Sequence, residues 1–228
     1  MLEAGPPSTF AGLPARDRDD LRGAAVAILG VSDASPYKPG EPSRSAGAPA
    51  ALRAASAQFA RQHGQYDFDL DQVFLADRAV VDCGDLPCDP ADAPGNRARI
   101  AAAVRAILAA GAVPLVLGGD DSVPIPVFQA YEGHGPLTIV QVDAHVDWGD
   151  VLRGNPYGYG STMRRAADLP WVASMVQVGI RGFGSGTPDQ MDNARAWAAA
   201  SSPCATFAAT AWTTPWAPFH PVRTASSP

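Results

Sequence analysis

Three residues that can bind a metal ion stand at alternate positions in this sequence: Asp143, His145 and Asp147. They directly follow an apolar run, Leu137–Val142. If the backbone stays extended through them, alternation points all three side chains to one side. Carboxylates and an imidazole can ligate a divalent first-row metal, or two ions that make hydroxide from water. The alternative is a solvated strand end that carries a chance D-x-H-x-D pattern.

A second acidic group follows another apolar run. The segment GGDDS, over residues 118–122, comes directly after the apolar residues 113–117. Apolar runs without a polar face are typical of central strands in a parallel sheet, which are covered on both faces. Ligands of open α/β sheets bind beyond the carboxyl ends of the strands. We therefore expect both acidic segments to emerge at one edge and to form one site.

The rest of the chain alternates between short apolar runs and helical patterns. The clearest helix covers residues 96–110, where Ile100, Val104 and Ile107 fall on one face. Strand–helix–strand order is typical of a parallel sheet, so the sequence predicts an α/β fold. Strands are predicted over residues 24–30, 79–82, 113–117, 137–142 and 176–180, and helices over residues 48–63, 96–110, 122–131 and 161–167.

Composition excludes several classes of protein. The 228 residues are 46% hydrophobic and carry a formal net charge of −6 without a basic stretch, so we expect no nucleic-acid partner. No apolar run approaches the length of a membrane span, so we expect no membrane partner. Three cysteines do not form a disulfide framework and indicate free thiols in the cytoplasm. An acidic site would suit a cationic small molecule.

The segments GGDDSV and VDAHVDWGD resemble the ureohydrolase family, which includes arginase and agmatinase and has the motifs GGDHS, DAHxD and SxDxDxxDP. The resemblance continues through VQVGIRGFG, over residues 176–184, and looks closest to agmatinase-like members. It implies a three-layer α-β-α fold with a mainly parallel sheet. It also implies a binuclear manganese centre, a guanidino substrate that yields urea and an amine, and a homo-oligomer.

The resemblance also suggests roles for individual residues. Asp143 would bridge two ions, His145 would bind one, and Asp121 and Asp147 would bind the other. Asp147 would also act as the catalytic residue that assists proton transfer to the leaving amine. Asp121 stands where the family has a histidine. Tyr159 aligns with another family histidine and is predicted to contact the substrate. The SxDxDxxDP motif, which supplies two further ligands, is absent from this sequence.

The composition divides the chain into three parts. We expect a flexible N-terminal arm over residues 1–22, an incomplete ureohydrolase α/β domain over residues 23–197, and an aberrant tail over residues 198–228. The tail is rich in Ala, Ser, Thr, Pro and Trp, and Arg223 is its only charge. Our hypothesis is a shifted reading frame or a truncated gene product that lacks the C-terminal part of the fold. The alternative is a genuine low-complexity segment.

These observations predict a metal-dependent amidinohydrolase of the agmatinase type. Because two ligands are missing, we expect weak metal binding and little or no urea release from this chain. Two alternatives stay open. The chain is a catalytically inactive relative that only binds a partner or ligand, or it is a different metal-dependent hydrolase that acts on an amide.

Overall fold

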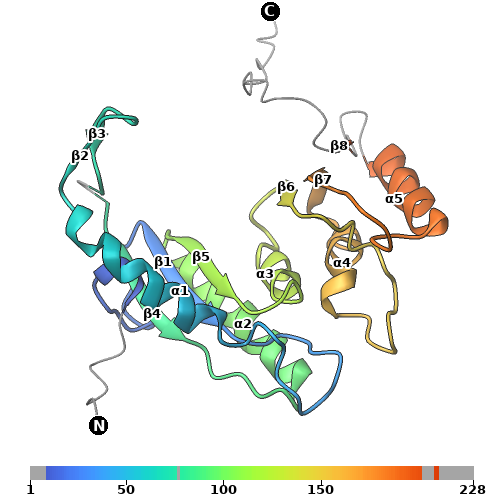
Figure 1. Cartoon of the computed structure of the whole chain (residues 1–228), viewed down its shortest axis with the longest axis horizontal. Helices are drawn as coiled ribbons and strands as arrows, with labels where there is room; N and C mark the ends of the chain where they lie inside the picture. Colours follow the sequence, from blue (N-terminus) through green and yellow to red (C-terminus); the bar gives the residue numbers. More distant parts are fainter. Residues whose placement is uncertain (1–8, 76–77, 202–207, 211–228) are drawn as a thin grey trace, which may run out of the picture.

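The first sheet is built around β1 (Val26–Val31), an apolar strand whose residues are almost all buried. The computed structural model describes residues 9–75, 78–201 and 208–210. In it, β1 pairs in parallel with β4 (Val80–Asp85) on one side and with β5 (Val113–Gly118) on the other. Helix α2 (Ala93–Ala109) connects β4 to β5 (Figure 1). This is the parallel strand–helix–strand arrangement that the sequence predicts.

The two faces of β1 pack against different layers. Ala27, Leu29 and Val31 belong to the core that α2 covers. Ile28 points to the opposite face, where it packs with Leu13 and Leu117. Its neighbour in register, Asp82 of β4, binds Arg53 of helix α1 (Ala48–Ser56) on that same face. Helices therefore cover the sheet on both sides, and the expected three-layer α-β-α architecture is confirmed.

A second parallel sheet follows along the chain. It contains β6 (Leu137–Val142), β7 (Val172–Val178) and β8 (Ala208–Thr210), in that spatial order. Helix α4 (Thr162–Ala167) precedes β7, and helix α5 (Pro188–Ser201) precedes β8. Trp148, Met163 and Met175 are buried in the core that these helices share with the sheet.

The two sheets are not joined to each other within the described part of the chain. Helix α3 (Pro124–Ala130) connects β5 to β6, and each of these strands pairs with one described strand only. One face of each is accessible: Val113 and Val140 are 60% and 61% exposed. The prediction that both strands are covered on both faces is therefore wrong. An apolar run specifies a strand, but it does not specify the place of that strand in the sheet.

Local signals explain where the helices begin and end. Helix α2 begins at residue 93 and not at residue 96, because the side chain of Asp92 accepts a hydrogen bond from Gly95 N at 2.9 Å. The helix predicted over residues 48–63 is α1 followed by the 3-10 helix η2 (Ala57–Gln62). Two short antiparallel strands, β2 (Tyr66–Asp67) and β3 (Gln72–Val73), form a hairpin after it.

The described part of the predicted N-terminal arm is attached to the first sheet. Residues 9–22 include the 3-10 helix η1 (Phe10–Gly12), and the side chains of Leu13 and Leu21 are buried. Backbone hydrogen bonds of 3.0 Å from Asp82 N to Pro14 O, and from Arg16 N to Asp82 O, fix it to β4. Composition alone suggested a looser segment here, because it does not show that these few apolar residues reach the core.

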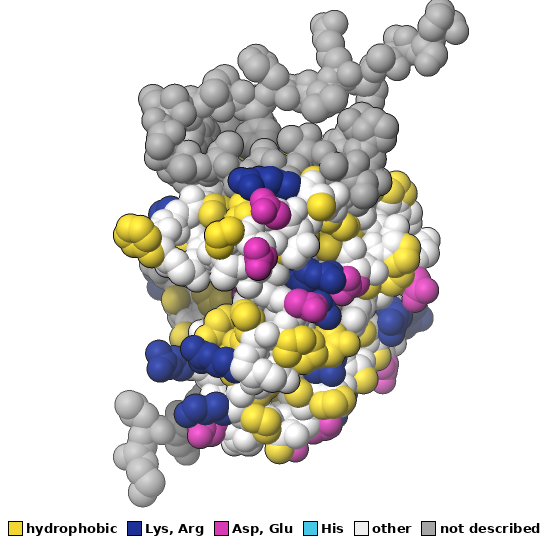
Figure 2. All heavy atoms as spheres, turned by 90° about the vertical axis from the view of Figure 1, so that its right-hand side faces the viewer, with side chains coloured by type: hydrophobic (Ala, Val, Ile, Leu, Met, Phe, Trp, Pro, Cys, Tyr) yellow, Lys and Arg dark blue, Asp and Glu magenta, His cyan; other side chains and the backbone are white. Residues whose placement is uncertain are grey.

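The predicted tail begins inside α5, and residues 208–210 pair with β7 as β8. The rest of it, including Trp212, Trp216 and Phe219, lies outside the described residues. None of the described helices is long and apolar enough to cross a membrane. The described part of the face on the α5 side carries acidic and basic side chains interspersed with apolar ones (Figure 2).

Candidate metal centre

Three carboxylates from two separate loops come together in the structure. One oxygen of Asp121, one of Asp143 and one of Asp147 all lie within 4.8 Å of one another. Asp121 follows β5, and the other two residues follow β6. The prediction that the two acidic segments emerge at one edge is confirmed, although β5 and β6 do not pair.

The backbone over residues 143–147 is not extended. The side chain of Asp143 accepts a hydrogen bond from His145 N at 2.8 Å, and Asp147 has a left-handed φ of 48°. The expectation that one extended strand aligns all three side chains is therefore wrong. The His145 ring lies with Nδ1 3.0 Å from Asp143 Oδ1, and its side chain is 64% exposed. His145 lies at the edge of the carboxylate group, and its role as a ligand stays a prediction.

Two glutamines hold Asp147 in place. Gln141 Nε2 donates to Asp147 Oδ2 at 2.8 Å, and Gln177 in turn donates to Gln141 and, at 3.0 Å, to Val146 O. The backbone carbonyl of Asp147 also accepts from Met163 N at 3.1 Å. Sequence reasoning missed both glutamines. The available signal was an amide side chain inside each of two apolar strands, where a polar group needs a partner.

The electrostatics of the three carboxylates fit a bound cation. Burial, and next the negative charge of Asp147, raise the pKa of Asp121 to about 8. Burial also raises the pKa of Asp147. Asp121 Oδ2 is buried, and no donor of the described residues reaches it. No described lysine or arginine forms an ion pair with the three. An all-oxygen donor set with an unsatisfied atom suits a hard divalent ion such as Mg²⁺ or Mn²⁺.

Gly119 allows the loop that carries Asp121 to lie close to β1. A Cβ atom at Gly119 would lie 1.8 Å from the carbonyl oxygen of Ser32, so any side chain must displace the backbone. We expect Gly119→Ala to lower the free energy of unfolding by about 1–3 kcal/mol, as overpacking does. Urea titration followed by circular dichroism measures it. Gly47→Ala is the control, because nothing lies within 4 Å of its Cβ position; equal effects would contradict the prediction.

A cavity of about 690 Å³ opens above the carboxylates. Tyr159 lines it, and its ring stands edge-on to the ring of Tyr37 at a centroid distance of 4.7 Å. The hydroxyl of Tyr37 accepts a hydrogen bond from Gly160 N at 3.3 Å. Tyr159 therefore lies where a substrate contact is predicted, and this role stays a prediction. Sequence analysis does not identify Tyr37, because residues 31–48 are rich in Ser, Pro and Gly and carry no motif.

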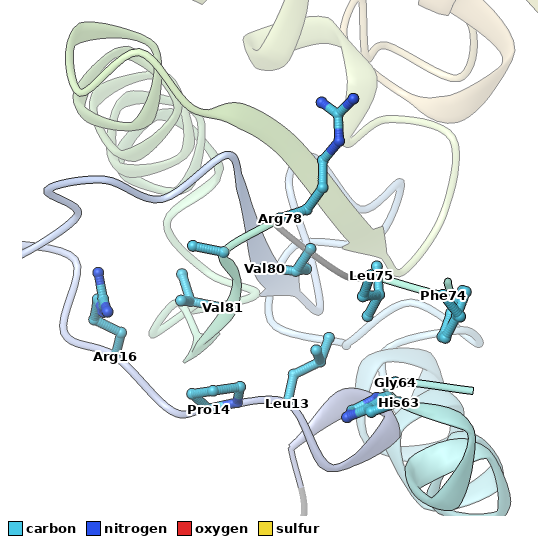
Figure 3. A pocket seen from close by; sticks show the side chains of 11 residues that line it. Leu13, Pro14, Arg16, His63, Gly64, Phe74, Leu75, Arg78, Val80 and Val81 are labelled. Carbon is cyan, nitrogen blue, oxygen red and sulfur yellow. The ribbon is translucent and has the colours of Figure 1, made fainter. Parts of the chain in front are cut away.

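A smaller cavity of about 260 Å³ lies elsewhere, at the start of β4. Its lining is mainly apolar, with Leu13, Leu75 and Val80 from three different segments around it (Figure 3). None of the described residues around it is a carboxylate. The clustered carboxylates therefore line the larger cavity, whereas the ionisable side chains among the described lining of the smaller one are Arg16, His63 and Arg78.

Comparisons with known proteins agree with this arrangement. Mitochondrial agmatinase of Gallus gallus is 42% identical over 106 residues, which cover 45% of this chain and 31% of that protein. Guanidinopropionase of Pseudomonas aeruginosa is also 42% identical over 106 residues, covering 45% of this chain and 33% of that protein. The structure of proclavaminate amidino hydrolase from Streptomyces clavuligerus matches with a TM-score of 0.69 and 31% identity, over 85% of this chain and 62% of that chain.

The family assignment depends on a longer match than the individual relatives provide. This chain spans only about a third of the length of the agmatinase and the guanidinopropionase. The model of the arginase family, however, matches residues 24–204, which include both sheets except β8 and all three clustered carboxylates. The chain therefore belongs to the arginase family.

Proposed function

We propose that this site hydrolyses a guanidino compound to urea and an amine with the help of divalent metal ions. The observation that carries the proposal is the cluster of Asp121, Asp143 and Asp147, with one oxygen of each within 4.8 Å of the others, below an open cavity. The names of the matched relatives, agmatinase and guanidinopropionase, support a guanidino substrate.

The clustered carboxylates would hold the metal, with His145 beside them, and manganese fits the oxygen-rich donor set. Bound metal supplies a hydroxide nucleophile near neutral pH, because it lowers the pKa of water. The carboxylates also attract the planar guanidinium cation and orient it through hydrogen bonds from its N–H groups. Gln141 fixes Asp147 Oδ2 at 2.8 Å, so that Asp147 is positioned to pass a proton to the leaving amine.

The described ligand set limits the activity that we expect. Divalent ions of this type take about six ligands each, and a binuclear centre shares several carboxylates between its ions. Three clustered carboxylates and one neighbouring histidine supply fewer groups than that. We therefore expect one metal position to be filled weakly and urea release to be slow.

The test combines metal binding with urea release on the purified chain. We expect slow urea release from agmatine, the substrate of the agmatinase-like members, when Mn²⁺ is present, and none after chelation. Asp147→Asn should abolish urea release, because it removes both a ligand charge and the proposed proton carrier. Asp189→Asn is the matched control, since Asp189 is exposed on α5, does not line the cavity and does not belong to the carboxylate cluster.

Three other outcomes identify the alternatives. Metal binding without urea from any guanidino compound indicates an inactive relative that only binds its ligand. Hydrolysis of simple amides without urea indicates an amide hydrolase. If the chain binds neither Mn²⁺ nor a guanidino compound, the proposed function is wrong.

A further inference from the structure

The cavity above the carboxylates is lined by charges of both signs that differ in burial. Asp121, Asp143 and Asp147 are buried or half-buried, and we call them the floor; Lys38, Arg44 and Arg153 are exposed, and we call them the rim. We propose that the substrate is a guanidino acid, with its guanidinium at the floor and its carboxylate bound at the rim by Arg153 and Arg44. This inference rests on the proposed function and names the substrate class of the same site.

The rim keeps a positive charge after its internal pairing is counted. Lys38 Nζ lies 3.0 Å from Glu41 Oε2, and both groups line the cavity, so their charges cancel locally. Arg44 and Arg153 have no carboxylate partner among the described residues. Two exposed guanidinium groups without a carboxylate partner among the described residues therefore line the cavity. A carboxylate is their natural partner, because it accepts two parallel hydrogen bonds from a guanidinium.

Arg153 is held at the rim by the wall of the cavity. Its guanidinium carbon lies 5.6 Å from the centroid of the Tyr37 ring, within the range of a cation–π interaction. The same ring packs edge-on against Tyr159 and lies so close to Gly158 that a Cβ atom there would be 2.3 Å from it. Tyr37 is thus fixed by its neighbours, and its ring contacts the Arg153 guanidinium.

The loop that carries Arg153 is fastened to the opposite loop of the cavity. Asn155 Nδ2 donates to Ser35 O at 3.1 Å and to Pro36 O at 3.3 Å, and Asn155 N and Leu152 O are joined at 2.9 Å. These contacts order the backbone on both sides of Arg153. Ordering lowers the entropy cost of binding a ligand at the rim. A cavity of about 690 Å³ is also the size of a site for a small molecule.

The charge pattern discriminates between substrates that share a guanidinium group. Agmatine carries an ammonium at its other end, which the arginines repel. Guanidinobutyrate carries a carboxylate at that end, and butylguanidine carries no charge. We therefore expect guanidinobutyrate to bind most tightly, butylguanidine to bind more weakly and agmatine to bind most weakly. The first two should differ about tenfold in Kd, which corresponds to about 1.4 kcal/mol.

Ligand-observed NMR titrations of the full chain with Mg²⁺, a diamagnetic stand-in for manganese, would test this order. Arg153→Gln should raise the Kd of guanidinobutyrate about fivefold to tenfold and leave the Kd of butylguanidine unchanged, since only guanidinobutyrate has a carboxylate. Arg153→Lys keeps the charge and should retain most of the preference. Arg105→Gln is the control, because Arg105 is exposed on α2 and does not line the cavity.

The outcomes separate this inference from the proposed function. If agmatine binds as tightly as guanidinobutyrate, or if Arg153→Gln weakens butylguanidine equally, the inference is wrong and the proposed function stands. If none of the three compounds binds, both are wrong. Loss of the preference in Arg153→Gln and its retention in Arg153→Lys would support the rim arginine as a specificity-determining residue.

Discussion

Replacing Arg53 by methionine is expected to lower the free energy of unfolding by about 3–5 kcal/mol, the usual cost of breaking a buried ion pair. Arg53 Nε and Nη2 donate to the two oxygens of Asp82 at 2.8 and 2.9 Å. The two side chains are only 8% and 1% exposed. Without the guanidinium, the Asp82 carboxylate stays buried, with the backbone amides of Phe10 and Gly84 as its donors. Urea-induced unfolding followed by circular dichroism measures the loss.

Two further variants show whether the ion pair is the cause. Arg105→Met removes an exposed arginine from α2, and we expect a change of no more than about 0.5 kcal/mol. Combining Arg53→Met with Asp82→Asn should recover much of the stability, because a neutral amide is less costly to bury than an unpaired carboxylate. An equal loss in Arg105→Met, or no recovery in the double variant, would contradict this explanation.

The same interaction has a defined pH dependence. Burial alone would raise the pKa of Asp82, but hydrogen bonds from Arg53 and from the Phe10 and Gly84 amides hold it below the ordinary 3.8. The unfolded chain therefore binds this proton more readily than the folded protein does. The stabilisation is complete above the unfolded pKa and disappears as the pH falls through the folded one. The difference in the free energy of unfolding between the native protein and Arg53→Met should therefore shrink when the pH falls below about 4.

The convergence of Asp121, Asp143 and Asp147 could be predicted because it depends on topology. Parallel strands with helical crossovers place all their carboxyl ends at one edge, so residues that follow two such strands meet. The direction of His145 could not be predicted in this way. The side chain of Asp143 accepts the His145 amide at 2.8 Å and turns the chain, and this local hydrogen bond competes with the strand pattern.

Other parts of the site depend on tertiary placement that no local pattern reveals. Tyr37 reaches the cavity from the loop after β1, and its position is set by contacts with Gly158 and Tyr159, more than a hundred residues further along the chain. Gln141 and Gln177 lie in strands that an apolar pattern identifies correctly, but their pairing across β6 and β7 depends on register. Sequence reasoning therefore found the carboxylates and missed the groups that position them.

Replacing Asp121 by asparagine is expected to have opposite effects on stability and on metal binding. In the metal-free protein, burial and the neighbouring Asp147 raise the pKa of Asp121 to about 8. The folded state at neutral pH must therefore take up a proton that the unfolded chain does not bind, and asparagine removes this cost. We expect a stabilisation of about 1 kcal/mol, equivalent to a rise in Tm of about 2–4 °C for a domain of this size. Thr162 should stay in place, because it donates to the backbone carbonyl of residue 121, and its hydrogen bond to the Asp121 side chain can still be accepted by an asparagine amide oxygen.

Metal binding should change in the other direction. Loss of a residue that hydrogen-bonds a metal ligand weakens metal binding by about 10–100-fold. A direct carboxylate ligand contributes at least as much, so Asp121→Asn should weaken the binding of Mn²⁺ by at least that factor. Thermal unfolding with and without Mn²⁺ measures both effects in one experiment, because a ligand that binds only the folded state raises Tm. Asp189→Asn should change neither value.

A metal-free Asp121→Asn protein that is less stable than the native one would show that the three carboxylates do not repel one another. An unchanged response to Mn²⁺ would show that Asp121 is not a ligand, and that the aspartate at this position does not serve the role of the histidine in the GGDHS motif.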